Sequence, residues 1–359
     1  MSSRGGMWTL SRAVDSFERH RERWDTLNKA SGNHILLDSG LVSLLLRHFG
    51  SDRIFLAVCD EPDRPGMALV EKTRSGFWQT FQPSQAPLGL ILLGSGHDVP
   101  GQMRRLIRSL PGYALGLAVL HQDPDYSAFA GLPPGGGVET VDYIRTARVT
   151  FSGTFEDYWK ARDRHFVRDL ARRRRRLTES GIPAELSTIR EPGHVAQAIR
   201  EYGRLETAGW KAELGTAISA DNPQGAFYRE LLEHFCERQE AVVYRLVLGG
   251  KTAAANLCLA RDGMLVVLKT TYDESLPAFS PGRLLDEDMR RALFTEGRIK
   301  VEEYYGPFNE SQGKWTDEVR TLFHVNVYRS GAVRRLQQVV KTSLAWLRDR
   351  RKPPHPPAA

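Results

Sequence analysis

Short apolar runs and amphipathic segments alternate along most of the chain. In the first part, apolar or alternating runs predict strands at 54–58, 67–70, 77–81, 90–93, 113–120 and 141–149. Helical periodicity predicts helices at 41–49 and 100–110. This alternation favours an α/β domain over residues 34–150, preceded by a polar, arginine-rich extension over residues 1–33 that we expect to be peripheral.

The same alternation continues after residue 150. We expect one long basic amphipathic helix that Gly181 ends, then helices at 194–208 and 227–238. Strands are predicted at 184–189, 241–248, 252–260, 264–268, 300–305 and 326–328. A second α/β domain therefore spans residues 151–330. A basic amphipathic helix over residues 331–352 and a disordered proline-rich tail over residues 353–359 complete the chain.

A helix start follows the strand at 264–268. Ser280 is the expected N-cap, Pro281 takes the first helical position, Gly282 leaves the first turn without a side chain, and Gly297 ends the helix. A strand that leads into such a helix can present free N–H groups and the positive end of the helix dipole to a phosphate. An ordinary capped helix is the alternative, and the acidic run 286–288 counts against an anion site.

The charge balance points to an anionic partner. The chain carries a net charge of +7 and a pI near 9.4, which suits a nucleotide, a nucleic acid or an anionic lipid surface. Five consecutive arginines at 172–176 could bind phosphates, or form a solvated face paired with nearby acids. The three cysteines are far apart and the histidines lack a metal-ligand spacing, so we expect no metal, no disulfide and a cytoplasmic protein. No apolar run approaches the roughly 20 residues of a membrane helix, although the C-terminal basic helix leaves contact with the inner face of the membrane open.

Several motifs in the second part carry a family resemblance. They are the segments 175–181, 205–211, 215–218, 269–274 and 279–285. In this order, and among these strands and helices, they resemble the GNAT acyltransferase superfamily. The resemblance is to its FemAB-like branch, which includes acetyltransferases associated with cellulose biosynthesis. The resemblance implies two tandem GNAT-like domains with mixed central sheets, of which residues 34–150 are a degenerate first copy.

The resemblance also implies an acyl-CoA co-substrate and places the site. Glu206 is the expected general base, with a structural salt bridge to Lys211 or an arginine as its alternative. Tyr272, or Tyr304 and Tyr305 beside the next strand, would protonate the leaving thiolate. The expected cofactor-binding residues are Lys269, Thr270, Thr271, Ser280, Gly282, Arg283 and Leu284, and the expected acceptor-binding residues are Trp210, Lys211, Lys314 and Trp315.

Two departures leave the acceptor open. The usual GNAT pyrophosphate loop is absent, and residues 302–315 match the branch only through Lys314 and Trp315. The first hypothesis is acyl transfer from acyl-CoA to an amine or hydroxyl of a cell-envelope, polysaccharide or small-molecule acceptor. Aminoacyl-tRNA-dependent transfer, with tRNA as partner, is the second. A non-catalytic module that binds nucleic acid or membrane through its basic helices is the third.

Overall fold

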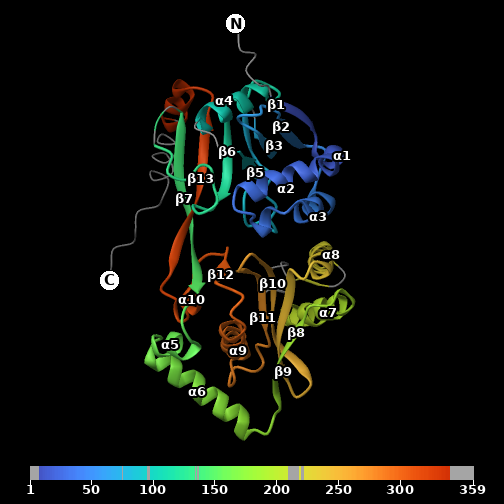
Figure 1. Ribbon diagram of the computed structural model, residues 1–359, viewed down its shortest axis with the longest axis vertical. Helices are drawn as coiled ribbons and strands as arrows, with labels where there is room; N and C mark the ends of the chain where they lie inside the picture. Colours follow the sequence, from blue (N-terminus) through green and yellow to red (C-terminus); the bar gives the residue numbers. More distant parts are fainter. Residues whose placement is uncertain are drawn as a thin grey trace, which may run out of the picture.

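The computed structural model describes residues 8–74, 76–94, 98–133, 135, 137–208, 218–219 and 222–339. Within these residues, thirteen strands form one sheet in the order β1-β2-β3-β4-β6-β13-β7-β12-β11-β10-β9-β8, with β5 paired to β3. The sheet has an upper and a lower part, which β7 joins (Figure 1). This mixed α/β architecture confirms the predicted fold class.

The first half of the chain builds the upper part. Its strands are β1 (Trp8–Arg12), β2 (Ile54–Cys59), β3 (Gly66–Arg74), β4 (Phe77–Thr80), β5 (Ile91–Leu93), β6 (Gly116–Gln122) and β7 (Val138–Thr150). Its helices are α1 (Ala13–Ser16), α2 (Arg21–Ala30), α3 (Ser39–Phe49) and α4 (Val99–Ser109), with 3₁₀ turns η1 (Phe17–His20) and η2 (Ile35–Leu37).

The second half of the chain builds the lower part and also contributes β13 to the upper part. Its strands are β8 (Ala184–Ile189), β9 (Ala241–Leu248), β10 (Lys251–Arg261), β11 (Met264–Tyr272), β12 (Val301–Tyr304) and β13 (Val319–Tyr328). Its helices are α5 (Phe155–Lys160), α6 (Arg164–Glu179), α7 (Pro192–Ala208), α8 (Pro223–Glu237), α9 (Pro281–Glu296) and α10 (Glu310–Gly313). Gly249 and Gly250, both at positive φ, form the tight hairpin turn between β9 and β10.

Two long strands connect the parts. β7 pairs with β13 through residues 138–147 and then with β12 through residues 148–150. β13 also pairs with β6, so the last strand of the chain lies in the upper part of the sheet (Figure 1). The predicted range 151–330 groups this strand with the second domain by its position in sequence, whereas its hydrogen bonds place it with the first.

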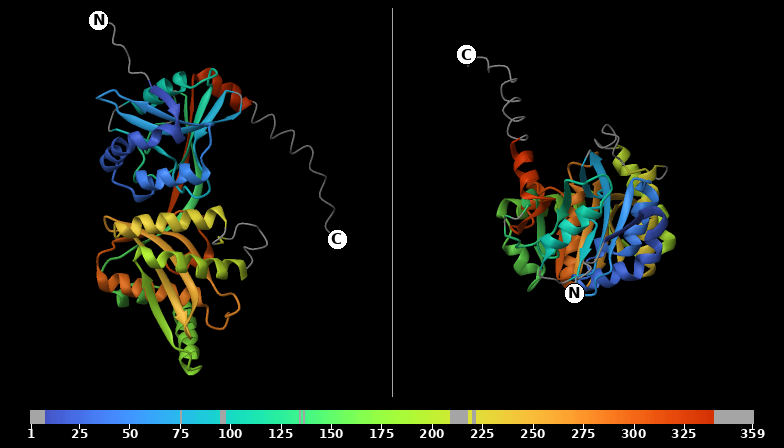
Figure 2. Two further views of the ribbon diagram at one scale, coloured as in Figure 1. Left: turned by 90° about the vertical axis from the view of Figure 1, so that its right-hand side faces the viewer. Right: turned by 90° about the horizontal axis from the view of Figure 1, so that it is seen from above.

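Apolar side chains form three clusters on the two faces of the sheet. One cluster is common to both halves, and in it α2 and α3 of the upper half meet α7 and α8 of the lower half. On the other face, α4 covers the upper part, while α6 and α9 cover the lower part. Figure 2 shows the layer of α2 and α3 stacked on the layer of α7 and α8 along one side of the molecule. The shared cluster ties the halves together.

Several local expectations need correction. The N-terminal segment is part of the core rather than peripheral, because Trp8, Phe17 and Trp24 are at most 2% exposed. The single helix expected before Gly181 is two helices, since the chain breaks between α5 and α6 and Asp163 caps the second. Residues 331–339 are helical, with Leu336 and Val339 exposed, and the rest of the predicted C-terminal helix lies outside the described residues. Among the described helices, none is both long and apolar enough to cross a bilayer.

Candidate functional site

A cleft opens where two parallel strands separate. β11 and β12 pair from Met264–Val301 to Val267–Tyr304, and β11 then continues alone to Tyr272 along this edge. The chain after Tyr304 turns away toward the upper half. The resulting cleft has a volume of about 950 Å³ and is bordered by β11, β12, the N-terminus of α9 and the α10 segment. It is large enough for a ligand of cofactor size.

The N-terminus of α9 faces this cleft. Ser280 is the N-cap residue, as predicted, but its backbone is left-handed (φ 51°) and its side chain makes no capping hydrogen bond. Pro281 at the first position and Gly297 at the end are as expected. A Cβ on Gly282 would lie 3.2 Å from the Tyr272 ring, so the bare glycine keeps the first turn open beside this ring. Pro281 has no N–H and Arg283 N donates to the Ser280 carbonyl at 3.0 Å, so the Gly282 N–H and the helix dipole are what this start offers to an anion.

The floor of the cleft carries a polar network. The Asn256 side chain donates to Asp286 Oδ1 at 3.1 Å, and Tyr304 donates to Glu302. Arg290 donates to both Glu302 oxygens and to the Tyr304 hydroxyl. Desolvation by burial raises the pKa of Asp286 to about 6, in part opposed by Arg290. A carboxyl group with such a pKa can exchange protons near neutral pH.

The predicted cofactor residues converge on this cleft. Those among its lining residues are Lys269, Thr270, Thr271, Ser280, Gly282 and Arg283, together with the predicted catalytic residue Tyr272 and the predicted acceptor residue Trp315. These residues lie close together because they belong to two stretches of consecutive residues, one on β11 and one at the start of α9. The two stretches meet where β11 and β12 separate.

Residues 164–307 match a family model described as acetyltransferase (GNAT) domain. The matched residues of the second half are a GNAT domain. Solved structures extend the likeness to the whole chain, although their low identities show the fold alone. FemX matches with a TM-score of 0.57 at 8% identity, over 89% of this chain and 98% of its own. A conserved protein of unknown function from Bacteroides thetaiotaomicron matches with a TM-score of 0.57 at 11% identity, over 90% and 100%.

A third structure is the C-terminal domain of a putative lysylphosphatidylglycerol synthetase from Agrobacterium fabrum. It matches with a TM-score of 0.51 at 14% identity, over 92% of this chain and 97% of its own. A search of curated proteins finds no match. The family match and the FemX likeness confirm the GNAT superfamily and the FemAB-like fold.

The upper half has the corresponding strand pair without the open helix start. β4 and β6 are parallel and α4 lies between them in sequence, as α9 lies between β11 and β12 of the GNAT domain. At α4, however, the Asp98 carboxylate accepts a hydrogen bond from Gly101 N at 2.8 Å. A negatively charged cap occupies the place that an anionic ligand would take.

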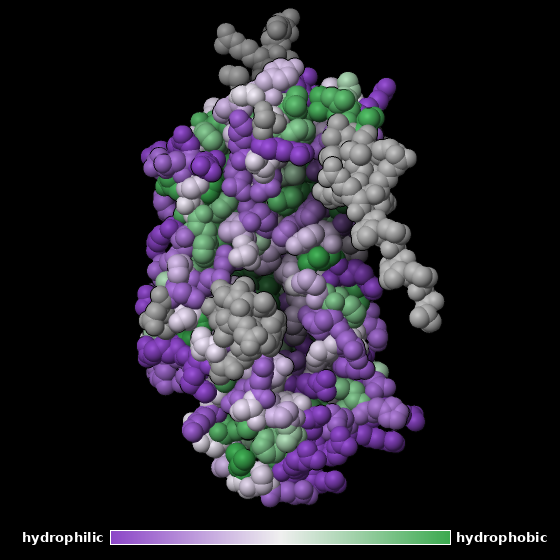
Figure 3. Space-filling view, turned by 180° about the vertical axis from the view of Figure 1, so that it is seen from behind, coloured by the Kyte–Doolittle hydropathy of each residue, from purple (hydrophilic) through white to green (hydrophobic). Residues whose placement is uncertain are grey.

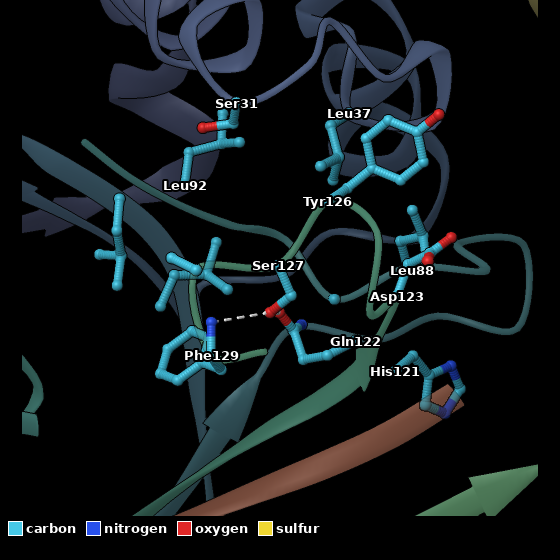
Figure 4. A pocket seen from close by; sticks show the side chains of 14 residues that line it. Ser31, Leu37, Leu88, Leu92, His121, Gln122, Asp123, Tyr126, Ser127 and Phe129 are labelled. Carbon is cyan, nitrogen blue, oxygen red and sulfur yellow. Dashed lines mark hydrogen bonds between the residues drawn. The ribbon is translucent and has the colours of Figure 1, made fainter. Parts of the chain in front are cut away.

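A small cavity in the upper half is also closed to ligands. It measures about 30 Å³ and lies among residues of β5, β6 and the following loop (Figure 4). Inside it, the Ser127 hydroxyl donates to Gln122 Oε1 and accepts from the backbone N–H of Phe129. This volume suits one water molecule.

The predicted base lies outside the cleft lining. Glu206 on α7 is 2% exposed, and its carboxylate accepts from Tyr202 Oη at 3.0 Å and from Ile218 N at 2.7 Å. The bond from Ile218 N ties α7 to the segment before α8, whereas Tyr202 lies on α7 itself. Trp210 and Lys211, the predicted acceptor residues of the same motif, lie outside the described residues.

Tyr305 lies at the junction of the two halves and not in the cleft. Its hydroxyl donates to Asp123 Oδ2 at 2.7 Å and lies 2.7 Å from His34 Nε2. His34 Nδ1 accepts from Leu36 N, so Nε2 carries the proton and donates to Tyr305. Burial and the Asp123 charge hold the pKa of Tyr305 well above its ordinary value. These contacts indicate that Tyr305 stabilises the junction between the two halves.

Two further predicted residues are also not among those that line the cleft. Leu284 is 0% exposed and packs in the core beneath α9. Lys314 extends toward solvent, 3.9 Å from Glu310. Asn256 and Asp286 are among the cleft residues that sequence reasoning did not select. Asp286 stands four positions after Gly282, which puts the two on one face of α9, and this spacing was the available signal.

The arginine run of α6 is largely paired within the protein. Arg174 bonds to Glu287 and Asp288 at 2.7 Å, and Arg172 and Arg173 both pair with Asp169. Arg173 also donates to the Pro277 carbonyl at 2.8 Å and lines the cleft. The rear view shows hydrophilic residues gathered at the lower right, over the α5–α6 corner (Figure 3). Arg174 therefore holds α6 against α9, whereas Arg172 pairs within α6.

Proposed function

We propose that this chain transfers an acyl group from acyl-CoA to the amine or hydroxyl of a cell-envelope, polysaccharide or small-molecule acceptor. The observation that carries the proposal is the meeting of two features in one cleft. The N-terminus of α9 offers the Gly282 N–H and the positive end of the helix dipole for the pyrophosphate, and the separation of β11 from β12 offers room for the thioester.

The chemistry needs donors for the developing oxyanion and an acid for the leaving group. The edge of β11 beyond Val267 faces the cleft and is the candidate source of a backbone N–H for the thioester oxygen. Tyr272 is 49% exposed beside Gly282, and its hydroxyl is the candidate acid for the thiolate. As the acceptor forms its bond to the carbonyl carbon, the C–S bond breaks and the sulfur takes that proton.

Calorimetric titration with acetyl-CoA and with free CoA tests the proposal. Gly282→Asp would place a carboxylate at the helix start and should abolish binding. Gly193→Asp is the matched control, because Pro192 and Gly193 also open a helix and nothing lies within 4 Å of a Cβ there. We expect wild type and Gly193→Asp to bind with equal affinity. No CoA binding by wild type, or unchanged binding by Gly282→Asp, would contradict the site.

Aminoacyl transfer from aminoacyl-tRNA is the second candidate. Its support is the FemX likeness, which spans both halves of the chain. Against it, the arginines of α6 are mostly engaged by acids and carbonyls of the protein. Release of labelled amino acid from charged tRNA, in the absence of CoA binding, would favour this reaction. If the protein catalyses neither reaction but binds RNA or lipid in a salt-sensitive way, the result would favour the non-catalytic binding module.

We further propose a cytoplasmic site of action, where the acyl-CoA donor is available. The helical residues 331–339 expose Leu336 and Val339 among basic neighbours, which is the pattern of a helix that can lie on an anionic membrane. Sedimentation with anionic and with neutral vesicles distinguishes peripheral binding from its absence.

A further inference from the structure

Asp286 occupies a recess of the cleft that no other part of the proposed reaction uses. It lies one helical turn beyond Gly282 on α9, and its side chain is 23% exposed. Oδ1 accepts from Asn256, whereas Oδ2 has Arg290 Nη1 only at 3.8 Å, beyond hydrogen-bonding distance. One oxygen of a recessed carboxylate is therefore left for a ligand.

The charges around Asp286 do not cancel its own. Arg290 of the same helix is the nearest cation, but Glu302 of β12 holds it with two hydrogen bonds. The other titratable groups that face Asp286 are Tyr304 of β12, Tyr158 of α5 and Cys258 of β10, all neutral at physiological pH. With Asp286 ionised, the recess holds two carboxylates and one guanidinium. A cationic ligand group would restore neutrality.

An independent feature of the same cleft also calls for a ligand. Trp315 lines the cleft and is 2% exposed, with its ring 4.4 Å from the Arg290 guanidinium. Its indole Nε1–H is buried and has no hydrogen-bond acceptor among the described residues. A buried donor of this kind is costly to leave unpaired, so a ligand oxygen or a bound water in the cleft is its expected partner.

We propose that Asp286 binds the ammonium group of the acceptor and takes its proton, so that the acceptor is an amine and not an alcohol. This inference rests on the proposed function. Asp286 accepts one proton from R–NH₃⁺ and leaves R–NH₂, whose lone pair forms the C–N bond to the thioester carbonyl. The C–S bond breaks with its electron pair on sulfur, the sulfur takes the Tyr272 hydroxyl proton, and the second proton of the attacking nitrogen passes back to Tyr272. An amide and CoA–SH result, and Asp286 returns its proton to water.

A pair of probes that differ in charge tests the site directly. Wild-type protein, with and without saturating CoA, is titrated with propylammonium chloride and with 1-propanol near neutral pH. We expect saturable binding of propylammonium and at least about tenfold weaker binding of propanol, as for the loss of one ion pair. Binding should weaken as the pH falls below about 6, because protonation removes the Asp286 charge.

Two variants on α9 complete the test. Asp286→Asn should lose about tenfold or more in propylammonium affinity while CoA affinity stays unchanged. Asp288→Asn makes the same chemical change two positions away, where the carboxylate pairs with Arg174, and should bind propylammonium like wild type. Equal binding of the two probes, an unaffected Asp286→Asn, or no propylammonium binding by wild type would overturn the assignment. If wild type does not bind CoA, the proposed function is overturned instead. The propylammonium titration without CoA distinguishes this failure from a failure of the Asp286 assignment.

Discussion

Arg290 of α9 and Glu302 of β12 form a two-pronged ion pair, with Nε–Oε2 at 2.9 Å and Nη2–Oε1 at 3.0 Å. The two side chains are 1% and 0% exposed. The pair joins the helix and the strand that border opposite sides of the cleft. It therefore holds the spacing between them, and it keeps Arg290 from neutralising Asp286.

Breaking this pair on one side should destabilise the protein strongly. Arg290→Met leaves the Glu302 carboxylate buried without its cation, and we expect the free energy of unfolding to fall by about 3–5 kcal/mol. Urea unfolding followed by circular dichroism measures it. Arg298→Met is the control, because Arg298 is 76% exposed and its loss should change stability by less than about 0.5 kcal/mol. A change for Arg290→Met as small as the control's would mean that the pair contributes little.

Asp286→Asn should make the protein more stable at neutral pH. The folded-state pKa of Asp286 is raised from 3.8 to about 6, so the folded state binds more protons than the unfolded state between these values. Stability contributed by this group is lost as pH rises through that window. The variant should gain about 2–3 kcal/mol near pH 7.5 and nothing below about pH 4, which thermal unfolding across pH measures. A variant less stable than wild type at pH 7.5 would contradict the destabilisation that the raised pKa of Asp286 implies.

Tyr305→Phe should affect stability and not the cleft. The change removes the hydroxyl that donates to Asp123 and accepts from His34, and we expect a cost of about 1–3 kcal/mol. CoA affinity should be unchanged, because Tyr305 is not among the residues that line the cleft. Urea unfolding and calorimetric CoA titration separate the two effects. A large loss of CoA affinity with unchanged stability would return Tyr305 to the site.

Arg173→Ala should weaken CoA binding, since Arg173 lines the cleft and holds the Pro277 carbonyl just before α9. We expect a loss of about fivefold to tenfold in affinity, equivalent to one charged hydrogen bond. Arg175→Ala is the control, because Arg175 is 72% exposed and pairs only weakly with Glu179 in the same helix. Equal affinities for the two variants would exclude Arg173 from cofactor binding.

The sequence predicted most strands and helices because their signals are local. The cleft residues of β11 and α9 were also predictable, since they are consecutive and follow a strand and a helix start. The sequence did not distinguish the roles of the neighbouring Tyr304 and Tyr305. Successive side chains of a strand point to opposite faces, so Tyr304 reaches the cleft floor while Tyr305 reaches the junction with His34.

The proposed base, Asp286, was harder to predict because its pKa depends on groups that are distant in sequence. Asp286 acquires its raised pKa from burial, with Asn256 of β10 and Glu302 of β12 beside it. Glu206 stood in a family-like motif, but its two donors, Tyr202 and Ile218, give it a structural environment that no local pattern reveals. Likewise, the difference between Asp98 capping α4 and Ser280 leaving α9 uncapped depends on backbone geometry.

The pairing of β13 between β6 and β7 sets an order of events during synthesis. When the ribosome has made the first 150 residues, the edges of β6 and β7 that β13 will join still lack their partner. The GNAT domain can assemble its own strands β8–β12 before residues 319–328 emerge. The half of the protein that is translated first is thus the half that finishes folding last, and exposed strand edges in that interval are where a chaperone would be needed.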